Sequence, residues 1–190
     1  MTSANFAVHA DAIIPVSGPE NVLKSHSIVV RQGLIDALMP HAQARALSDI
    51  DHVELPGHVL MPGLVNAHGH AGMTLLRGYA DDMSLASWLN DKIWPLEARW
   101  VSPEFVRDGT DIAAAEMLLS GITTTSDMYF FPDIAAQSLR MAGMRTQLVF
   151  PVMNIETAWA KNAEEYFEKG LALRDYFRND DLVDLSLIHI

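Results

Sequence analysis

The chain carries the stretch Leu60-Met61-Pro62-Gly63-Leu64-Val65-Asn66-Ala67-His68-Gly69-His70, an apolar run that ends in two histidines one residue apart. Alternate residues of a β-strand project to the same face, so the two imidazoles are expected to lie about 7 Å apart on one face. Gly69 leaves the opposite face clear. Two imidazoles in this arrangement suit one cation, and we predict that His68 and His70 are metal ligands.

The spacing of the two histidines is weak evidence by itself. A chain with 8 histidines in 190 residues is expected to contain about 0.3 His-x-His pairs by chance. The surrounding sequence strengthens the signal. Pro62-Gly63 predicts a turn, and the residues from Leu64 to Ala67 predict a parallel strand that is buried on both faces. The histidines then fall at the carboxyl end of the strand, where barrel enzymes hold their catalytic groups.

The stretch from Leu60 to His70 resembles the first barrel strand of the amidohydrolase superfamily, whose pattern is Pro-Gly-Leu/Phe-Val/Ile-Asn/Asp-x-His-x-His. Residues 75–82 and 88–97 narrow the resemblance to the deaminase and chlorohydrolase branch, where the 5′-methylthioadenosine/S-adenosylhomocysteine deaminases are the most similar group. The resemblance covers residues 6–184. It implies an α/β fold, namely the first part of a metal-dependent (β/α)8 TIM barrel preceded by strands of a composite β-sandwich.

Two domains are expected from this resemblance, with residues 1–60 in the sandwich and residues 61–190 in the barrel. A complete (β/α)8 barrel needs about 250 residues, so we expect the barrel to be incomplete in this chain and the chain to be an N-terminal fragment. In the first domain, strands are predicted at residues 6–14, 28–31 and 34–38, with Gln32-Gly33 as a tight hairpin turn.

Strands and helices alternate in the second domain, which predicts a parallel sheet. A helix with apolar residues at helical spacing is expected to begin at Ser84 and to stop at Pro95. Further helices are predicted from Ser102 to Gly121 and at 133–140 and 163–177, and strands at 122–128, 146–152 and from 182 onward.

The last five residues, Ser186-Leu187-Ile188-His189-Ile190, depart from the family pattern. A substrate-contacting histidine of the family falls near this region, but His189 is out of register, and we do not transfer that role to it. We expect these residues to be translated adaptor sequence, and the alternative is a divergent fourth strand. The resemblance places the other metal ligands and the acid-base glutamate beyond residue 190, so no catalytic residue is assigned.

The resemblance implies one divalent metal ion, expected to be zinc, and hydrolytic deamination of adenosine derivatives such as 5′-methylthioadenosine or S-adenosylhomocysteine by attack of metal-bound hydroxide. The substrate would be a small purine nucleoside. Alternatives are a guanine deaminase or triazine chlorohydrolase of the same superfamily, or a non-catalytic truncated barrel homologue. Because His68 and His70 supply two ligands where such a site needs about three, the 190-residue chain alone is expected to be inactive.

Two residues are candidates for substrate binding. Glu97 falls where the similar deaminases hold the ribose hydroxyls, and a carboxylate accepts two hydroxyl hydrogen bonds. The alternative is a solvated carboxylate that follows the stop at Pro95. Trp94 is a candidate wall for the purine, although large apolar residues at helical spacing more often pack in a core. Asp127, at the end of the second barrel strand, either faces the site or caps the next loop.

Composition disfavours several classes of partner. The net charge of −11, without a lysine or arginine cluster, disfavours nucleic acid. The apolar runs are shorter than the roughly 18 residues that a membrane helix needs. The sequence has no cysteine, so a metal must bind imidazole, carboxylate or water. We expect a cytoplasmic protein that is a homo-oligomer when full length, as related enzymes commonly are.

The other histidines have no paired spacing and are expected to lie at the surface or in packing; those singled out are His9, His26, His41, His52 and His58.

Overall fold

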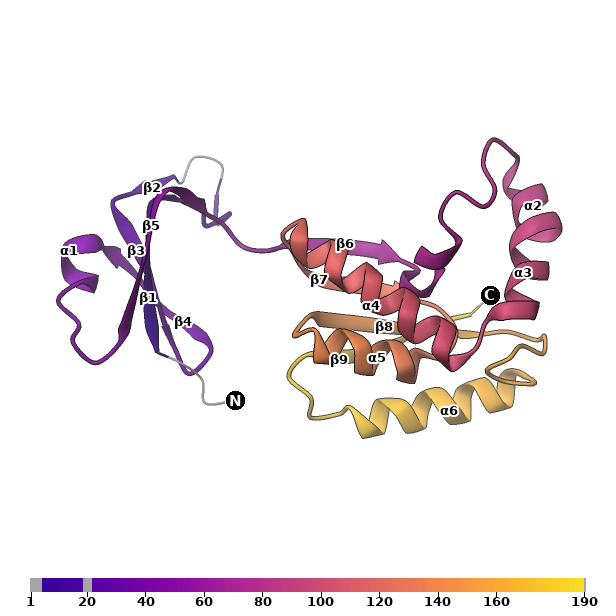
Figure 1. Cartoon of the computed structure of the whole chain (residues 1–190). Coiled ribbons are helices and arrows are strands. Elements are labelled where there is room, and N and C mark those ends of the chain that lie inside the picture. The colour runs from indigo at the N-terminus through magenta and orange to yellow at the C-terminus, as the bar shows by residue number, and fades with distance from the viewer. Residues whose placement is uncertain (1–4, 19–21, 190) are drawn as a thin grey trace. The chain divides into compact units, whose positions relative to one another are not determined.

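The computed structural model describes residues 5–18 and 22–189. The chain divides into two compact units, Met1–Pro62 and Gly63–Ile190, and each unit contains its own β-sheet (Figure 1). Within the described residues, no helix is long and apolar enough to cross a membrane.

The described residues of the first unit form a five-stranded sheet and one short helix, which lies between the last two strands. Its elements are β1 (Phe6–Ile13), β2 (Leu23–Lys24), β3 (His26–Arg31), β4 (Leu34–Pro40), α1 (His41–Ala44) and β5 (Asp51–Leu60). The order is β2-β1-β3-β4, and β5 pairs with β1 in parallel. Gln32 and Gly33 have φ of 52° and 80°, as a two-residue hairpin turn requires, so the predicted hairpin is confirmed.

The sequence pattern does not predict β5, because Pro56-Gly57 has the composition of a turn. The structure places this dipeptide in an irregular part of the strand, where the register with β1 shifts between Ala10 and Ala12. The backbone N–H of Gly57 donates to Oδ2 of Asp11 at 3.0 Å. A bulge of this kind lets the strand continue past residues that would otherwise end it.

Three histidines without paired spacing form one hydrogen-bonded network with Ser27 in the first unit. The buried His9 places Nδ1 2.7 Å from Oγ of Ser27 and Nε2 2.9 Å from Nδ1 of His52. His41 Nδ1 lies 2.8 Å from the same Ser27 oxygen. Because Nε2 of His52 donates to the carbonyl of Leu47, neutral His52 accepts at Nδ1, and His9 is the donor to it.

The buried position of His9 in this hydrogen-bonded network predicts a pH-dependent stability. Burial lowers the pKa of His9, the nearby Glu54 raises it, and the neighbouring Arg45, His52 and His41 lower it further. A lowered folded-state pKa stabilises the fold above the unfolded-state pKa of about 6.5, and this contribution is lost as the pH falls through that value toward the folded-state pKa.

We therefore expect the free energy of unfolding of the chain to fall more steeply between pH 7 and pH 5 than that of the His9→Asn variant. Urea denaturation at several pH values measures the difference. The control is His58→Asn, which changes an exposed histidine of the same unit and should retain the wild-type slope. Equal slopes for wild type and His9→Asn would contradict the interpretation.

The second unit is a parallel sheet with helical connections. Its strands are β6 (Leu64–Gly69), β7 (Ile122–Met128), β8 (Arg145–Val152) and β9 (Val183–His189), in the order β6-β7-β8-β9. The helices α4 (Pro103–Leu119), α5 (Pro132–Met141) and α6 (Ala163–Tyr176) connect them. The predicted alternation is confirmed, and Oγ of Ser102 caps α4 by accepting from the Phe105 N–H at 3.2 Å.

One face of this sheet is covered by α4 and α5, which lie in front of it in Figure 1. Buried Val106 of α4 and Leu139 of α5 pack with Leu148 of β8 in the main hydrophobic cluster. The β-strands therefore have a rigid support, and the loops at their carboxyl ends are held in place by it.

The prediction that β6 is buried on both faces is wrong for this chain. Leu64 is 49% and Val65 is 64% exposed. The reason is topological, because in the described part of the chain β6 lies at the edge of the sheet and pairs only with β7. A strand whose apolar sequence is typical of the interior of a sheet therefore has one edge without a partner strand among the described residues.

The predicted helix stop at Pro95 is also wrong. After the 3₁₀ helix η1 (Ala71–Leu76), α2 (Leu85–Ser87) leads into a π-helical stretch, η2 (Trp88–Ile93), and then into α3 (Trp94–Trp100). The N–H of Trp94 donates to the carbonyl of Leu89, five residues back. This wider turn precedes Pro95, which occupies the first turn of α3, where proline is tolerated because it has no N–H to bond.

The ending of the chain is extended. Residues through His189 belong to β9 and pair in parallel with β8, from Thr146 opposite Val183 to Val152 opposite His189. Ile190 lies outside the described residues.

Candidate metal centre and active site

The structure brings His68 and His70 together at the carboxyl end of β6. His68 belongs to the strand, and His70 directly follows it and precedes η1. The two ring centroids are 4.9 Å apart, and the ring planes meet at 83°. The two side chains that the sequence singled out are therefore neighbours.

A backbone carbonyl fixes the orientation of His70. Its Nδ1 lies 2.7 Å from the carbonyl oxygen of Met128 at the end of β7. A carbonyl can only accept, so Nδ1 carries the proton and Nε2 presents a lone pair. This arrangement is typical of metal-binding histidines, because the hydrogen bond selects the tautomer and the direction of the ring.

Asp127 holds the backbone that follows the histidine pair. Its carboxylate is buried, and Oδ1 accepts from the N–H of Ala71 at 2.6 Å. The segment that it binds is the start of η1, after β6, whereas the sequence left two alternatives open, a carboxylate that faces the site or one that caps the loop after β7. Burial raises the pKa of Asp127, and the nearby His70 and His68 oppose this shift. Oδ2 is buried with no hydrogen-bond partner among the described residues.

These residues fit one part of a metal site. Nε2 of His70 is available as a ligand, His68 lies beside it, and an unpartnered carboxylate oxygen of Asp127 is buried nearby. Imidazole nitrogen is a suitable donor for zinc. Across residues 5–18 and 22–189, however, no group of three or more candidate side chains could hold a metal ion. The chain thus offers a histidine pair, and further ligands would have to come from elsewhere.

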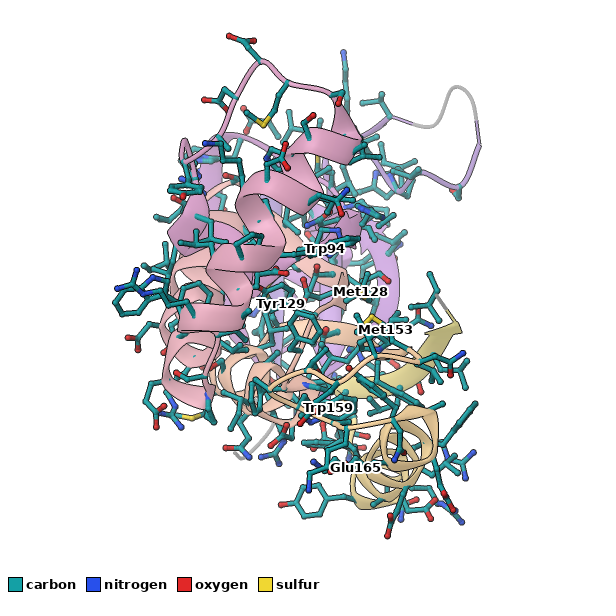
Figure 2. The ribbon with its side chains drawn as sticks, turned by 90° about the vertical axis from the view of Figure 1, so that its right-hand side faces the viewer. Trp94, Met128, Tyr129, Met153, Trp159 and Glu165 are labelled. Carbon is teal, nitrogen blue, oxygen red and sulfur yellow. The ribbon has the colours of Figure 1, made fainter. Side chains whose placement is uncertain are left out.

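A cavity of about 280 Å³ lies beside His70 at the carboxyl ends of the strands. Its walls are mostly apolar and include Met73, Trp88, Trp94, Met128 and Met153. Figure 2, which faces this end of the sheet, shows Trp94, Met128, Tyr129 and Met153 close together. Such a cavity, apolar with a few polar groups, is typical of a small-molecule site.

Glu97 is half-buried in the wall of this cavity, because α3 continues past Pro95 and turns the carboxylate inward. Its Oε1 accepts a hydrogen bond of 2.8 Å from the hydroxyl of Tyr129. Burial raises the pKa of Glu97, while the hydrogen bond from Tyr129 and the proximity of His70 lower it. The partial burial and the hydrogen bond from Tyr129 disfavour the alternative of a fully solvated carboxylate.

Trp94 lies at the rim of the same cavity and is 52% exposed, so it does not pack in a core. Trp88 lines the cavity from η2, and its indole N–H donates to the carbonyl of Ala80 at 3.1 Å. The π-helical stretch η2 and the start of α3 thus present one indole each to the same cavity.

The sequence pattern does not single out Tyr129. This residue lines the cavity, is buried, and is bonded to Glu97. Its position in the sequence could have indicated a role in the site, because it directly follows the end of β7. Side chains at the carboxyl ends of parallel strands converge on one site.

The fold and the histidine pair place the chain in a known class. The sequence pattern of the Amidohydrolase family matches residues 59–187, and the chain belongs to this family. Its relatives include the 5-methylthioadenosine/S-adenosylhomocysteine deaminase of Teredinibacter turnerae, which is 46% identical over 185 residues, or 97% of this chain and 42% of the relative. The chain therefore spans less than half the length of this relative.

Solved structures agree with this assignment. The crystal structure of an adenosine deaminase from Xanthomonas campestris with bound zinc is 40% identical in sequence to this chain and superposes on it with a TM-score of 0.94. The match includes 98% of this chain and 43% of the deaminase. An atrazine chlorohydrolase from Arthrobacter aurescens complexed with zinc has a TM-score of 0.85 at 20% identity, with 97% of this chain covering 46% of it. The second likeness concerns the fold alone. The predicted fold, the first part of a barrel preceded by β-strands, is confirmed.

Proposed function

We propose that the full-length protein containing this chain is a zinc-dependent aminohydrolase that deaminates 5′-methylthioadenosine or S-adenosylhomocysteine. The observation that carries the proposal is the histidine pair beside an apolar cavity that holds one half-buried carboxylate. The names of the relative and of the solved zinc-containing deaminase support the same reaction class.

His68 and His70 would hold the zinc together with ligands from outside the chain. Bound zinc would lower the pKa of a water molecule to near 7, which supplies a nucleophile at neutral pH. The residues of this chain would do the rest of the positioning. Met128 orients His70, Asp127 holds the start of η1 after it, and the apolar cavity would accommodate the purine. Water adds to the amine-bearing carbon, and ammonia leaves.

Glu97 would bind the ribose hydroxyls. Tyr129 occupies Oε1, and no partner for Oε2 is seen among the described residues, so this oxygen can accept from the substrate. Trp94, at the rim of the cavity, would contact the purine ring.

Replacing Glu97 with alanine in the full-length protein is expected to raise KM for 5′-methylthioadenosine by roughly tenfold to a hundredfold, because hydrogen bonds to charged groups contribute about 1.5–3 kcal/mol. The inhibition constant of adenine, which has no ribose, should change little. Steady-state kinetics measure both values, and Glu104→Ala, at an exposed position of α4, is the matched control. Equal losses for nucleoside and base would refute the ribose contact.

The proposed reaction is tested by incubating the full-length protein with 5′-methylthioadenosine, S-adenosylhomocysteine, guanine and a chlorinated triazine. We expect ammonia from the adenosine derivatives. Ammonia only from guanine, or chloride only from the triazine, would favour the alternative activities. No product from any of them would favour a non-catalytic homologue. The 190-residue chain alone should be inactive, since it contributes two ligands.

We further propose that residues 1–60 form the front of a composite β-sandwich, because Ile35 and Leu38 of β4, which lie opposite Val30 and Ile28 of β3, leave an apolar surface exposed on one face of the sheet. A cytoplasmic location, a homo-oligomeric full-length protein and the absence of nucleic acid partners stay predictions.

A further inference from the structure

We propose that Tyr129 is a positioning residue that holds the Glu97 carboxylate for ribose recognition and thereby favours ribosylated purines over free bases. The inference rests on the proposed function, because it assigns Tyr129 a role in the same cavity. Its basis is one hydrogen bond between two distant elements and the fixed position of the tyrosine ring.

The hydrogen bond joins α3 to the end of β7. Tyr129 and Glu97 are 32 positions apart in the sequence, and their oxygens are 2.8 Å apart. A free glutamate side chain loses rotamer entropy when it engages a ligand. A carboxylate that is already held in one orientation loses less, so the hydrogen bond favours ligand binding through preorganisation.

The tyrosine itself has little freedom. Its ring is buried, and its edge lies so close to Gly72 that a Cβ added at Gly72 would stand 2.6 Å from Cδ1 and 2.8 Å from Cε1 of the ring. On another side, the ring of Phe130 has its centroid 5.2 Å away. The hydroxyl is therefore presented from a rigid support, as a positioning residue requires.

In the hydrogen bond between Tyr129 and Glu97, the tyrosine hydroxyl is the donor and the carboxylate is the acceptor. Burial and the adjacent Glu97 raise the pKa of Tyr129 well above its usual range, so its hydroxyl stays protonated and donates. Glu97 then accepts at Oε1 and retains Oε2 for a second donor. A ribose hydroxyl is a donor of this kind, whereas a free purine base presents no such group at that position.

Tyr129→Phe in the full-length protein tests the inference, because phenylalanine keeps the ring that packs on Gly72 and removes only the hydroxyl. We expect KM for 5′-methylthioadenosine to rise roughly tenfold while kcat changes by less than about twofold. The inhibition constant of adenine should stay unchanged. Tyr176→Phe, which removes the hydroxyl of an exposed tyrosine on α6, is the matched control.

A double-mutant cycle separates positioning from packing. In the Glu97→Ala background, Tyr129→Phe should have no further effect on KM, since the group that it positions is gone. Calorimetric titration of the same variants with nucleoside and base should show the same selectivity in binding. An effect that persists in the Glu97→Ala background, or that is equal for nucleoside and base, would overturn the inference.

The two proposals fail in distinguishable ways. A wild-type protein that releases no ammonia from any nucleoside overturns the proposed function and the role of Tyr129 with it. An active wild type whose Tyr129→Phe variant has unchanged KM for nucleosides overturns the role of Tyr129 alone.

Discussion

Replacing His70 with alanine in the full-length protein is expected to remove stoichiometric zinc and to lower kcat/KM for 5′-methylthioadenosine roughly a thousandfold, because a catalytic metal contributes several kcal/mol and each 1.36 kcal/mol is tenfold in rate. The expectation follows from the geometry of the ring. Nδ1 is committed to the carbonyl of Met128, which leaves Nε2 for the metal. His68→Ala should act in the same direction.

A second substitution separates metal binding from local folding. Asparagine at position 70 can still donate to the carbonyl of Met128 but lacks the imidazole nitrogen, so His70→Asn should lose zinc as fully as His70→Ala. The control is His58→Ala, which removes an exposed histidine of the first unit. Metal analysis by atomic absorption, together with kinetics, measures both effects. A His70→Asn protein that keeps its zinc would contradict the assignment.

Gly109→Ala is expected to lower the free energy of unfolding by about 1–3 kcal/mol through overpacking. This sign is the reverse of the usual one, because alanine in a helix interior is favoured over glycine by about 1 kcal/mol. A Cβ added at Gly109 of α4 would lie 2.3 Å from the backbone oxygen of Gly72 and 2.9 Å from its carbonyl carbon. Backbone cannot rotate away as a side chain can, so α4 and η1 must separate.

The same displacement should reach the candidate site. Gly72 follows His70 by two residues and contacts the ring of Tyr129, so a shift of this segment should also weaken zinc binding. Chemical denaturation of the zinc-loaded full-length protein gives the free energy of unfolding. Asp111→Ala, at an exposed position of α4, provides the control. A Gly109→Ala variant that is as stable as the wild type would show that the contact is loose.

Local signals explain why much of the fold could be predicted from the sequence. The start of α4 depends on Ser102 and Pro103, which act within one turn, and the strands β7 and β8 have β-prone sequences between clear turns. The errors have non-local causes. The burial of β6 depends on which strands pair with it, and the helix at Pro95 continues because a π-helical turn precedes the proline.

In the candidate site, too, local features could be predicted from the sequence and non-local contacts could not. Only Gly69 separates His68, at the end of β6, from His70, so strand geometry was sufficient to predict that the two side chains are close together. The hydrogen bond between Tyr129 and Glu97 joins residues 32 apart, and that between His9 and His52 joins residues 43 apart. Neither pair has a sequence spacing that indicates contact, so only the three-dimensional structure could reveal them.

Anomalous X-ray diffraction at the zinc edge, on crystals of the full-length protein, would locate the metal that His68 and His70 are proposed to bind. We expect one anomalous peak at full occupancy, about 2.0–2.1 Å from a ring nitrogen of His68 and from Nε2 of His70, with Nδ1 of His70 still hydrogen-bonded to the carbonyl of Met128. A zinc peak away from these two imidazoles, or none in protein that deaminates 5′-methylthioadenosine, would contradict it.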